Sequence, residues 1–481
     1  MPQQPQVVQV VTGRTMAEIR RGRDAAVADL IELRLDGVAD LDVAAALSGR
    51  HLPVIVTCRA SWEGGAFDGS EEERFAVLSR AVALGAEFVD VEWKADRRHF
   101  VVSGRTQLVL SHHDFEGTPA DLAGRVRAMR AERPDILKIA ATPTRLRDLV
   151  AIRDAMAFNE PHVAIAMGFL GHISRSCPAA FGSCWTFAGT NAPGQLGADD
   201  LRRVYRVASQ SSATTIYGVA GQPLGHSASP AMHNAMLGAR GLDAVYVPFE
   251  TADAAELLDV AQAFDVCGLS VTAPLKESAF AAVPSFDDLS REIGALNTLR
   301  RSDAGWDGRN FDMAGLLAPL DARGLDLRGR RVVVLGAGGA ARMAVRALQS
   351  RGALVEIAAR RIDRGETVAR ELGAVAAVWP PLIGWDLLVN TTPAGTSPNV
   401  DESPLEREAV QGRMVYDLIY NPEETTLLRW ARQAGAETIG GLEMLVGQAC
   451  LQFEWWTGHR ADPQVMTEAA RRFIGQAQRH V

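Results

Sequence analysis

The sequence lacks the features that mark secreted, metal-binding and membrane-spanning proteins. Its five cysteines are scattered, and no CxxC pair occurs. This pattern predicts neither a disulfide framework nor a metal site, and it favours a reducing compartment, so we expect a cytoplasmic location. Residues Met1–Val10 contain no basic patch followed by an apolar run, which argues against a secretory signal. The longest uncharged run, Leu372–Trp385, contains two prolines and is too short to span a membrane.

Positive charge is not in excess either. The formal net charge is −8 at pH 7, whereas electrostatic binding of nucleic acid needs a basic face. We therefore expect no nucleic-acid or membrane partner, although local basic pockets for small anions are compatible with this charge. The composition, 47% apolar and 22% charged, is that of a globular protein, and 481 residues suffice for about three domains.

Residues 1–190 alternate short apolar, β-branched runs with helical stretches. The candidate strands are Val7–Thr12, Leu30–Leu35, Pro53–Cys58, Phe88–Glu92, Gln107–Ser111, Ile136–Ala140, Val163–Gly168 and Cys184–Ala188. Such alternation implies a parallel sheet, and eight units over about 200 residues predict a closed (β/α)8 barrel. The alternative is an open, doubly wound sheet.

Reactive side chains cluster where these predicted strands end, and a barrel carries its chemistry at the C-terminal ends of its strands. Both histidines of the pair at 112–113 are expected just after the fifth strand, and the lysine is expected within the sixth. The residues at such positions are Glu32, Arg34, Arg59, His112, His113, Lys138, Arg175 and Gln195. So many polar residues at corresponding ends are hard to explain as surface decoration, and they predict a site in the barrel mouth.

A small, polar stretch, Ser209–Thr215, interrupts the apolar periodicity and predicts a domain boundary. A second α/β series begins at Ile216, and a third unit begins at Arg331. We therefore predict a barrel in residues 1–211 followed by a two-domain α/β unit. Its first domain would be 212–327 completed by 441–481, and its second, of Rossmann type, would be 328–440.

Residues 331–341 read RVVVLGAGGAA, and a helical stretch follows. A strand, a tight glycine turn and a helix start direct backbone N–H groups at a pyrophosphate. The residues expected to line the turn are Gly336, Gly338, Gly339 and Ala340, with Ala341 at the third fingerprint position. The alternative is an ordinary strand–helix turn, but a further predicted strand at Leu354–Ala359 supplies the context of a dinucleotide site.

The end of that further strand distinguishes two cofactors. An NAD site usually has a carboxylate there for the ribose hydroxyls, whereas this chain has Arg360, Arg361 and then Arg364. The planar guanidinium pairs well with phosphate oxygens, so Arg360 and Arg364 predict a 2′-phosphate and hence NADP. The alternative is a solvated basic turn.

Hydroxyl, amide and charged side chains recur in the C-terminal half. They comprise the hydroxyls of Ser227, Ser229 and Thr272, the amides of Asn297, Gln448 and Gln452, and the pair Lys276 and Asp312. Such a set suits a polyhydroxylated carboxylate, and a lysine with an aspartate can relay the proton that accompanies hydride transfer. By spacing alone, Lys276 is more typical of a surface residue.

The segments that carry these residues resemble shikimate dehydrogenase from about Ile216 to the C-terminus. They read HSASPAMHN at 226–234, VTAPLK at 271–276, GALNTL at 294–299 and YDLIYNP at 416–422. The resemblance implies that Ser227 and Ser229 hold a substrate carboxylate and that the Lys276–Asp312 pair performs the proton step. It implies further pocket positions at Thr272, Asn297, Tyr420, Gln448 and Gln452. The chain departs from the family pattern at Ser270, Met313, Ala359 and Thr396, and these departures leave the catalytic pair intact.

In the barrel, a lysine on one strand beside a histidine on the next suggests carbonyl chemistry. A partly buried amine can form a Schiff base, whose iminium is an electron sink. A histidine can then remove an α proton and hand it to a leaving hydroxyl. The plainer alternatives are that Lys138 caps the barrel mouth and that His113 is a loop residue.

Residues 7–207 resemble type I 3-dehydroquinate dehydratase. The matching motifs are ELRLD at 32–36, TCRASWEGG at 57–65, SHHDF at 111–115, LKIA at 137–140, ISR at 173–175 and NAPGQ at 191–195. The resemblance implies Lys138 as the Schiff-base lysine, His113 as the acid/base with Glu63 near it, and Arg175 as the carboxylate ligand. It implies contacts to hydroxyls or to a lid for Glu32, Arg34, Arg59 and Gln195, while His112 is interpreted as a neighbour and not as a catalyst.

The two resemblances fit one pathway and one known arrangement, the bifunctional enzyme of plants. The barrel would dehydrate 3-dehydroquinate, and the second half would reduce the resulting 3-dehydroshikimate to shikimate with NADPH. One alternative is a non-catalytic regulator, which predicts lost catalytic residues, but all those named above are present. Another is an oxidoreductase for quinate, but Ser229 and Thr272 stand where quinate-preferring relatives have smaller residues, which favours shikimate.

Overall fold

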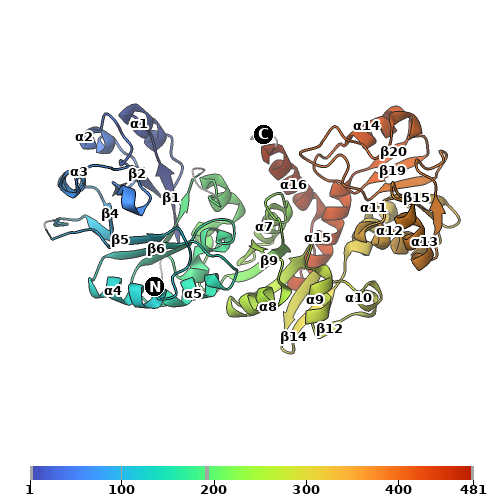
Figure 1. Ribbon diagram of the computed structural model, residues 1–481, viewed down its shortest axis with the longest axis horizontal. Coiled ribbons are helices and arrows are strands. Elements are labelled where there is room, and N and C mark those ends of the chain that lie inside the picture. The colour runs from blue at the N-terminus through green and yellow to red at the C-terminus, as the bar shows by residue number, and fades with distance from the viewer. Residues whose placement is uncertain (1–3, 99, 190–193, 478–481) are drawn as a thin grey trace. The chain divides into compact units, whose positions relative to one another are not determined.

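The computed structural model describes residues 4–98, 100–189 and 194–477. The chain divides into two compact units. One unit comprises residues 1–226 and 241–275, and the other comprises residues 227–240 and 276–481. Strands and helices alternate along the chain in both units (Figure 1).

Eight parallel strands form a sheet in the first unit, in the order β7-β6-β5-β4-β3-β2-β1-β8. They are β1 (Gln6–Val11), β2 (Leu30–Arg34), β3 (Val54–Thr57), β4 (Phe88–Glu92), β5 (Gln107–Asp114), β6 (Ile136–Ala141), β7 (His162–Ala166) and β8 (Trp185–Ala188). The two outermost strands meet, because the Cys184 N–H donates to the His162 carbonyl at 2.9 Å and the Ala164 N–H donates to Ser183 Oγ at 2.9 Å. The predicted barrel is therefore confirmed, with all eight predicted strands in place.

Helices connect successive barrel strands and cover their outer faces. They are α1 (Met16–Asp24), α2 (Val43–Leu47), η1 (Ser61–Glu63), α3 (Glu71–Ala83), α4 (Leu122–Ala131), α5 (Asp148–Ala155), α6 (His172–Ser176), η2 (Pro178–Phe181), η3 (Asp200–Val204) and η4 (Val207–Ser209). Local signals set their starts: Ser70 and Glu73 form a capping box before α3, in which each side chain accepts from the other's backbone N–H. Apolar residues such as Ile19, Leu33 and Leu78 then bury the helices against the strands.

The barrel interior has an apolar floor. It is built from Val8, Leu30, Ile55, Val109, Ile136, Ala140, Val163, Ile165, Trp185 and Phe187. Alternate residues of a strand share a face, so Lys138, two positions beyond Ile136, points into the same interior. The floor therefore fixes which side chains face the barrel axis above it.

One predicted boundary is wrong. The fifth strand runs to Asp114, so His112 and His113 lie inside it and do not follow it. The cause is the neighbouring strand, because β5 stays paired with β6 as far as Asp114 opposite Ala141. Alternation along β5 then sends the two histidine side chains to opposite faces.

The first unit also contains three parallel strands in the order β10-β9-β11, with one helix between them. They are β9 (Thr215–Gly221), β10 (Ala244–Glu250), α8 (Ala254–Ala263) and β11 (Val266–Val271). β9 begins one residue before Ile216, where the sequence predicts the start of the second α/β series.

The second unit begins with helices and a small group of strands in the order β13-β14-β12. The elements are α7 (Ser229–Ala239), α9 (Lys276–Ala282), β12 (Ser285–Phe286), α10 (Asp288–Ile293), β13 (Thr298–Ser302), β14 (Gly305–Arg309), α11 (Asp312–Ala322), α15 (Gly441–Thr457) and α16 (Pro463–Ala477). Gly315 of α11 lies so near α15 that a Cβ there would meet the Gln448 Cβ at 2.9 Å. This close packing brings residues about 150 positions apart into one cluster.

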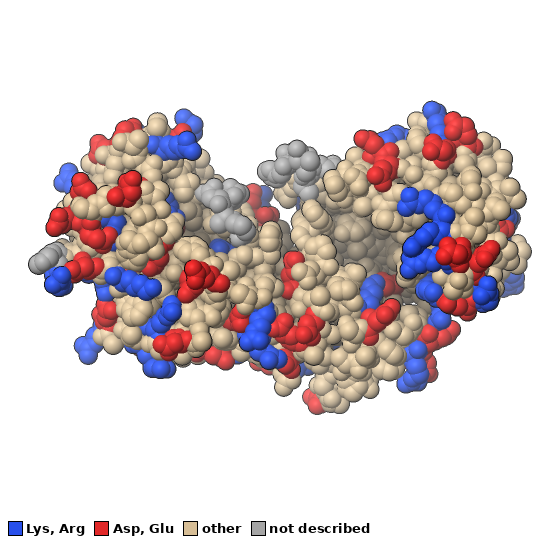
Figure 2. Space-filling view, in the orientation of Figure 1, with Lys and Arg blue, Asp and Glu red and all other residues tan. Residues whose placement is uncertain are grey.

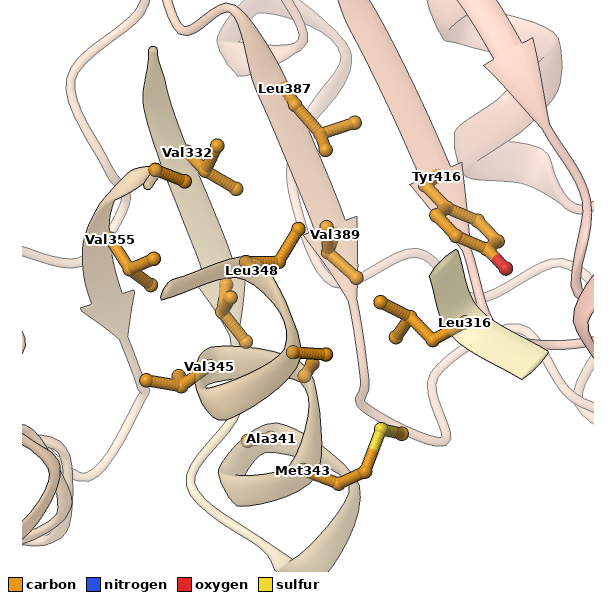
Figure 3. Close-up of a cluster of buried hydrophobic side chains, with 14 of the residues drawn as sticks. Leu316, Val332, Ala341, Met343, Val345, Leu348, Val355, Leu387, Val389 and Tyr416 are labelled. Atoms are coloured by element: carbon orange, nitrogen blue, oxygen red, sulfur yellow. The ribbon is translucent and has the colours of Figure 1, made fainter. Parts of the chain in front are cut away.

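Six strands in the order β17-β16-β15-β18-β19-β20, each parallel to its neighbours, form the remaining sheet. The elements are β15 (Arg331–Leu335), α12 (Gly339–Ser350), β16 (Leu354–Ala358), α13 (Ile362–Leu372), β17 (Val375–Ala377), β18 (Leu387–Asn390), η5 (Arg407–Ala409), β19 (Met414–Asp417), α14 (Thr426–Gln433) and β20 (Glu437–Ile439). Helix α12 packs Val345 and Leu348 against Val332 and Val389 (Figure 3). The predicted strand, turn and helix of a Rossmann-type fold are thus present. No helix in the described part of the chain is both long and apolar enough to cross a membrane.

Candidate active sites

Lys138 lies at the centre of the barrel mouth. Its side chain is only 6% exposed, and its Nζ lies 3.0 Å from Asp90 Oδ2 and 3.6 Å from Glu32 Oε1. The same nitrogen lies 4.2 Å from the centroid of the Phe187 ring. The amine is thus held in one place at the end of the apolar floor, as the sequence predicts for a reactive lysine.

A network of buried charges surrounds this lysine. Arg59 pairs with Asp90 at 2.9 Å and with Glu92 at 3.1 Å, and it donates to Ser111 Oγ at 2.8 Å. Arg74 pairs with the other oxygen of Glu92 at 2.5 Å. Burial opposes ionisation of Asp90, but the charges of Arg59 and Lys138 outweigh it and lower the pKa of this carboxyl. The Asp90 carboxylate next to Lys138 is therefore charged and fixed.

His113 and Glu63 form a hydrogen-bonded pair beside this network. The His113 Nδ1 and its backbone N–H each lie 2.9 Å from Glu63 Oε1. Burial would raise the pKa of Glu63, but the neighbouring imidazoles of His112 and His113 outweigh it and lower it to about 2. The pKa of His113 is lowered to about 4 by burial and then by the charge of Arg59. A carboxylate acceptor at Nδ1 places the ring proton there and leaves Nε2 as a base.

Arg175 is the cation of this site that has no carboxylate partner among the described residues. It is 5% exposed, its Nη1 lies 3.5 Å from the Phe187 carbonyl, and its Nε has no hydrogen-bond partner. Burial lowers its pKa to about 10. A buried guanidinium without a counter-charge is costly, which makes it suited to an anionic ligand.

The remaining predicted barrel residues lie around the mouth. Glu32 accepts from Thr57 Oγ1 at 2.8 Å. Arg34 forms a bidentate ion pair with Asp36, with both N···O distances at 2.9 Å. Gln195 lies beside Gly189: a Cβ atom built on Gly189 would lie 2.7 Å from the Oε1 of Gln195. Residues 191–193 of the predicted NAPGQ motif lie outside the described residues.

Lys276 and Asp312 meet in the second unit at 2.5 Å between Nζ and Oδ2. The other oxygen of Asp312 accepts from Asn297 Nδ2 at 2.9 Å, and the same amide lies 3.0 Å from Gln448 Oε1. The Lys276 side chain is 34% exposed, against 12% for Asp312. The lysine is thus accessible and paired with Asp312, and Asn297 holds the other oxygen of that carboxylate.

Gln452 braces this cluster from α15. Its Nε2 donates to Thr298 Oγ1 at 2.9 Å and lies 3.3 Å from the Asn297 carbonyl. Thr298 Oγ1 in turn donates to Asn297 Oδ1 at 2.7 Å. The amide of Asn297 is therefore fixed in the orientation that presents its NH2 group to Asp312.

Four further predicted residues lie at element ends. Ser227 precedes α7, and its Oγ accepts from the backbone N–H of Ser229 at 3.3 Å. Thr272 directly follows β11 and is half-buried. Tyr420 follows β19, and burial raises the pKa of its hydroxyl.

The glycine turn after β15 is open where a pyrophosphate would lie. Gly336 has φ +113°, and a Cβ there would meet Thr391 Oγ1 at 2.7 Å, so only glycine fits. At Gly338 and Gly339 a Cβ would meet no protein atom within 4 Å. Helix α12 begins there without a side-chain cap, and Ala340 is exposed. Free N–H groups at an open helix start suit a phosphate.

Arg360 and Arg364 are exposed at the end of β16 and the start of α13. Within the described residues neither forms an ion pair that would neutralise it. Figure 2 shows Lys and Arg side chains gathered where Figure 1 labels α12 and α13. No carboxylate replaces them at the end of β16, so this position favours a 2′-phosphate.

The sequence-based prediction missed the residues that hold the reactive ones. Asp90 and Glu92 carry charge at alternate positions of an otherwise apolar strand, FVDVE, and that pattern could have revealed them. Asp417 was also missed, although it is fully buried. Its carboxylate accepts hydrogen bonds from Thr425 Oγ1 at 2.7 Å, from Asn390 Nδ2 at 2.9 Å and from the backbone N–H of Ile419. Burial raises its pKa to about 6.

Comparison with known proteins identifies the family of each half of the chain. A family model for type I 3-dehydroquinase matches residues 7–212. Models for the shikimate dehydrogenase substrate binding domain and the shikimate 5'-dehydrogenase C-terminal domain match residues 219–299 and 441–471. The chain is 32% identical over 485 residues to the chloroplastic bifunctional 3-dehydroquinate dehydratase/shikimate dehydrogenase of Arabidopsis thaliana, covering 93% of this chain and 80% of that one. It belongs to this bifunctional family.

Two further relatives match the dehydrogenase half. The shikimate dehydrogenase (NADP(+)) of Thermosynechococcus vestitus is 39% identical over 289 residues, which cover 55% of this chain and 98% of that one. The shikimate 5-dehydrogenase of Thermus thermophilus, solved with NADP(H) and shikimate, is 37% identical with a TM-score of 0.50 and covers 54% of this chain and 99% of that one. Both resemblances stated from the sequence are confirmed: the bifunctional enzyme joins a dehydratase barrel to an NADP-type shikimate dehydrogenase.

Proposed function

We propose that the barrel dehydrates 3-dehydroquinate through a Schiff base and that the second half reduces the product, 3-dehydroshikimate, to shikimate with NADPH. The observation that carries this proposal is the pair of lysine–carboxylate centres, one in each fold. Lys138 is fixed at 3.0 Å from Asp90, and Lys276 is fixed at 2.5 Å from Asp312. Each lysine has a neighbouring group suited to its own step.

In the barrel, Lys138 would attack the substrate ketone, and its proton has acceptors in reach at Asp90 and Glu32. Loss of water from the adduct gives an iminium, which withdraws electrons from the adjacent carbon. Arg175, whose guanidinium has no carboxylate partner among the described residues, would hold the substrate carboxylate in a charge-assisted pair. Glu32, Arg34, Arg59 and Gln195 would contact the hydroxyls or order the segment over the mouth.

His113 would remove the α proton and return it to the departing hydroxyl. Its Nδ1 is engaged by Glu63 at 2.9 Å, which leaves Nε2 for the substrate. The carboxylate stabilises the imidazolium that forms transiently, as an aspartate does for the histidine of a serine protease. Hydrolysis of the imine then frees Lys138 and releases 3-dehydroshikimate.

In the second half, Lys276 would donate the proton to the ketone oxygen while NADPH supplies the hydride. Asp312 holds the ammonium, and Asn297 donates to the other oxygen of Asp312. Gln448 and Gln452 in turn contact Asn297. Ser227 and Ser229 would bind the carboxylate, and Thr272 and Tyr420 would complete the pocket. Gly336, Gly338, Gly339 and Ala340 would hold the pyrophosphate, and Arg360 and Arg364 would hold the 2′-phosphate.

We also propose the domain boundaries at 1–211, 212–327 with 441–481, and 328–440. The matches of the family models at 7–212, 219–299 and 441–471 support this division. For the location we propose the cytoplasm, supported by five cysteines that are all free thiols. The Arabidopsis relative is named as chloroplastic.

Arg360→Gln should raise the Michaelis constant for NADPH by about tenfold or more while that for NADH changes little, because a charge-assisted pair to the 2′-phosphate is lost. Initial rates with each cofactor at saturating 3-dehydroshikimate measure this effect. Arg370→Gln, at an exposed position in the last turn of α13, the helix that follows Arg360, is the matched control. Equal effects on both cofactors would show that Arg360 does not bind the 2′-phosphate.

Dehydration should persist well below neutral pH. The pKa of His113 is lowered to about 4, so its imidazole stays a neutral base above that pH. The value of kcat/KM should therefore fall only as the pH drops through about 4, where the imidazole takes up a proton. Circular dichroism at each pH separates this loss from acid unfolding, and a fall centred near pH 6.5 would contradict the assignment.

The overall test is a coupled assay of the full chain with 3-dehydroquinate and NADPH. Enone absorbance should rise and NADPH absorbance should fall, and omission of NADPH should let 3-dehydroshikimate accumulate. No enone from 3-dehydroquinate, with normal reduction of added 3-dehydroshikimate, would remove the dehydratase from the proposal.

A further inference from the structure

His112, which the sequence analysis interprets as a mere neighbour, has unusual contacts. It is 2% exposed, and Trp93 lies edge-on to its ring with the centroids 5.8 Å apart. Its Nε2 lies 3.0 Å from Arg125 Nη1 on α4. Its Nδ1 is buried without a hydrogen-bond partner and lies 3.8 Å from Glu63 Oε2.

These contacts determine where the ring proton lies. A guanidinium has only donors, so His112 Nε2 must be an acceptor toward Arg125. The proton of the neutral ring is then on Nδ1, which faces Glu63. Arg125 is itself held at 3.2 Å by Asp114, the residue that ends β5. Arg125, half-buried on α4, thus dictates the tautomer of His112.

Glu63 therefore stands between two imidazoles. One oxygen, Oε1, receives the His113 backbone N–H and lies 2.9 Å from the His113 ring nitrogen. The other oxygen, Oε2, faces the Nδ1–H of His112 at 3.8 Å, slightly beyond the distance of a normal hydrogen bond. A buried carboxylate stays ionised when a hydrogen-bond donor faces each of its oxygens. A carboxylate with one oxygen that faces no donor is more readily protonated.

We propose that His112, held in its Nδ1–H tautomer by Arg125, is a positioning residue that keeps Glu63 ionised and oriented toward His113. It acts through Glu63 and touches no substrate. The inference rests on the proposed function, in which His113 is the acid/base of the dehydratase. The charged groups that face His113 are Glu63 of η1, Arg59 after β3, Asp90 of β4 and Lys138 of β6. Substitution of His112 leaves these four groups in place, so their charges are the same in the wild-type and variant proteins.

The matched pair of variants is His112→Phe and His112→Asn. Phenylalanine keeps the packing against Trp93 but offers no donor, whereas asparagine restores an N–H close to the position of Nδ1. We expect His112→Phe to lower kcat for dehydration about tenfold with KM little changed, and to move the acid limb of the pH profile to higher pH, because Glu63 and His113 titrate as a pair. His112→Asn should recover most of the rate and the original limb. Loss of rate in His112→Phe without a shift of the limb, or failure of asparagine to restore it, would overturn the proposal.

A double-mutant cycle with Glu63→Gln tests the route of the effect. If His112 acts through the carboxylate, His112→Phe should cost little further activity in the Glu63→Gln background. Full additivity of the two losses would overturn the proposal. Failure of the proposed function itself is distinguishable, because His113→Gln alone would then leave dehydration intact. Reduction of 3-dehydroshikimate by the same preparations reports whether each variant chain is intact.

Discussion

Lys138→Ala should abolish dehydration of 3-dehydroquinate, with a loss of about 10⁴-fold or more, while reduction of 3-dehydroshikimate stays near the wild-type rate. The nucleophile that forms the covalent adduct is gone, and no other group in the mouth replaces it. The dehydrogenase centre uses Lys276 and Asp312 and does not depend on this amine. Both activities are measured on one preparation, by enone absorbance and by NADPH consumption.

Borohydride supplies an independent readout of the same variant. Reduction of the imine in the presence of 3-dehydroquinate should attach the substrate to the peptide that contains Lys138, as detected by mass spectrometry. Lys94→Ala, at an exposed barrel lysine, is the control and should still form the adduct. Lys138→Arg keeps a cation beside Asp90 and Glu32 but cannot form the imine, so it should be inactive without the cost of unpaired buried carboxylates. Wild-type dehydration by either Lys138 variant would remove this lysine from the mechanism.

Lys276→Ala should lower the turnover of 3-dehydroshikimate reduction by about 10²–10⁴-fold, because the positioned proton donor is lost. NADPH binding should change little, since the glycine turn at Gly336 to Gly339 and the arginines after β16 are untouched. Substrate affinity should change only modestly, because Ser227 and Ser229 would still hold the carboxylate. Steady-state kinetics and a fluorescence titration with NADPH measure the two effects separately.

A second substitution separates charge from proton donation at this position. Lys276→Arg preserves the ion pair with Asp312 but holds its proton far more tightly than lysine does. It should therefore bind 3-dehydroshikimate well and turn it over slowly. Near-normal turnover in Lys276→Ala, together with a collapse of substrate affinity, would make Lys276 a binding residue, and the proton would come from elsewhere.

The sequence was informative where a local rule sets the outcome. Eight alternating runs predicted the barrel, and the strand, glycine turn and helix at 331–350 predicted the Rossmann-type unit, because apolar period and turn chemistry act within a few residues. The SHHDF and LKIA motifs likewise placed His113 and Lys138 at neighbouring strands, and β5 and β6 are paired in the barrel. The end of β5 was predicted too early. A strand continues for as long as it stays paired with its neighbour, and the sequence of one strand does not show where that pairing ends.

The sequence by itself therefore determined the fold classes, the family motifs and the preference for arginine over a carboxylate after β16. Only the tertiary structure decided what surrounds the reactive groups. Asp90 pairs with Arg59 and Lys138, and Glu92 pairs with Arg59 and Arg74. These pairs form because β3, β4 and β6 are strands of one closed barrel. Asn297, which donates to Asp312, also meets Gln448 of α15, 151 positions away in the chain. Such contacts join segments that are far apart in the chain, so no local pattern encodes them, and the same is true of the approach of His112 to Glu63.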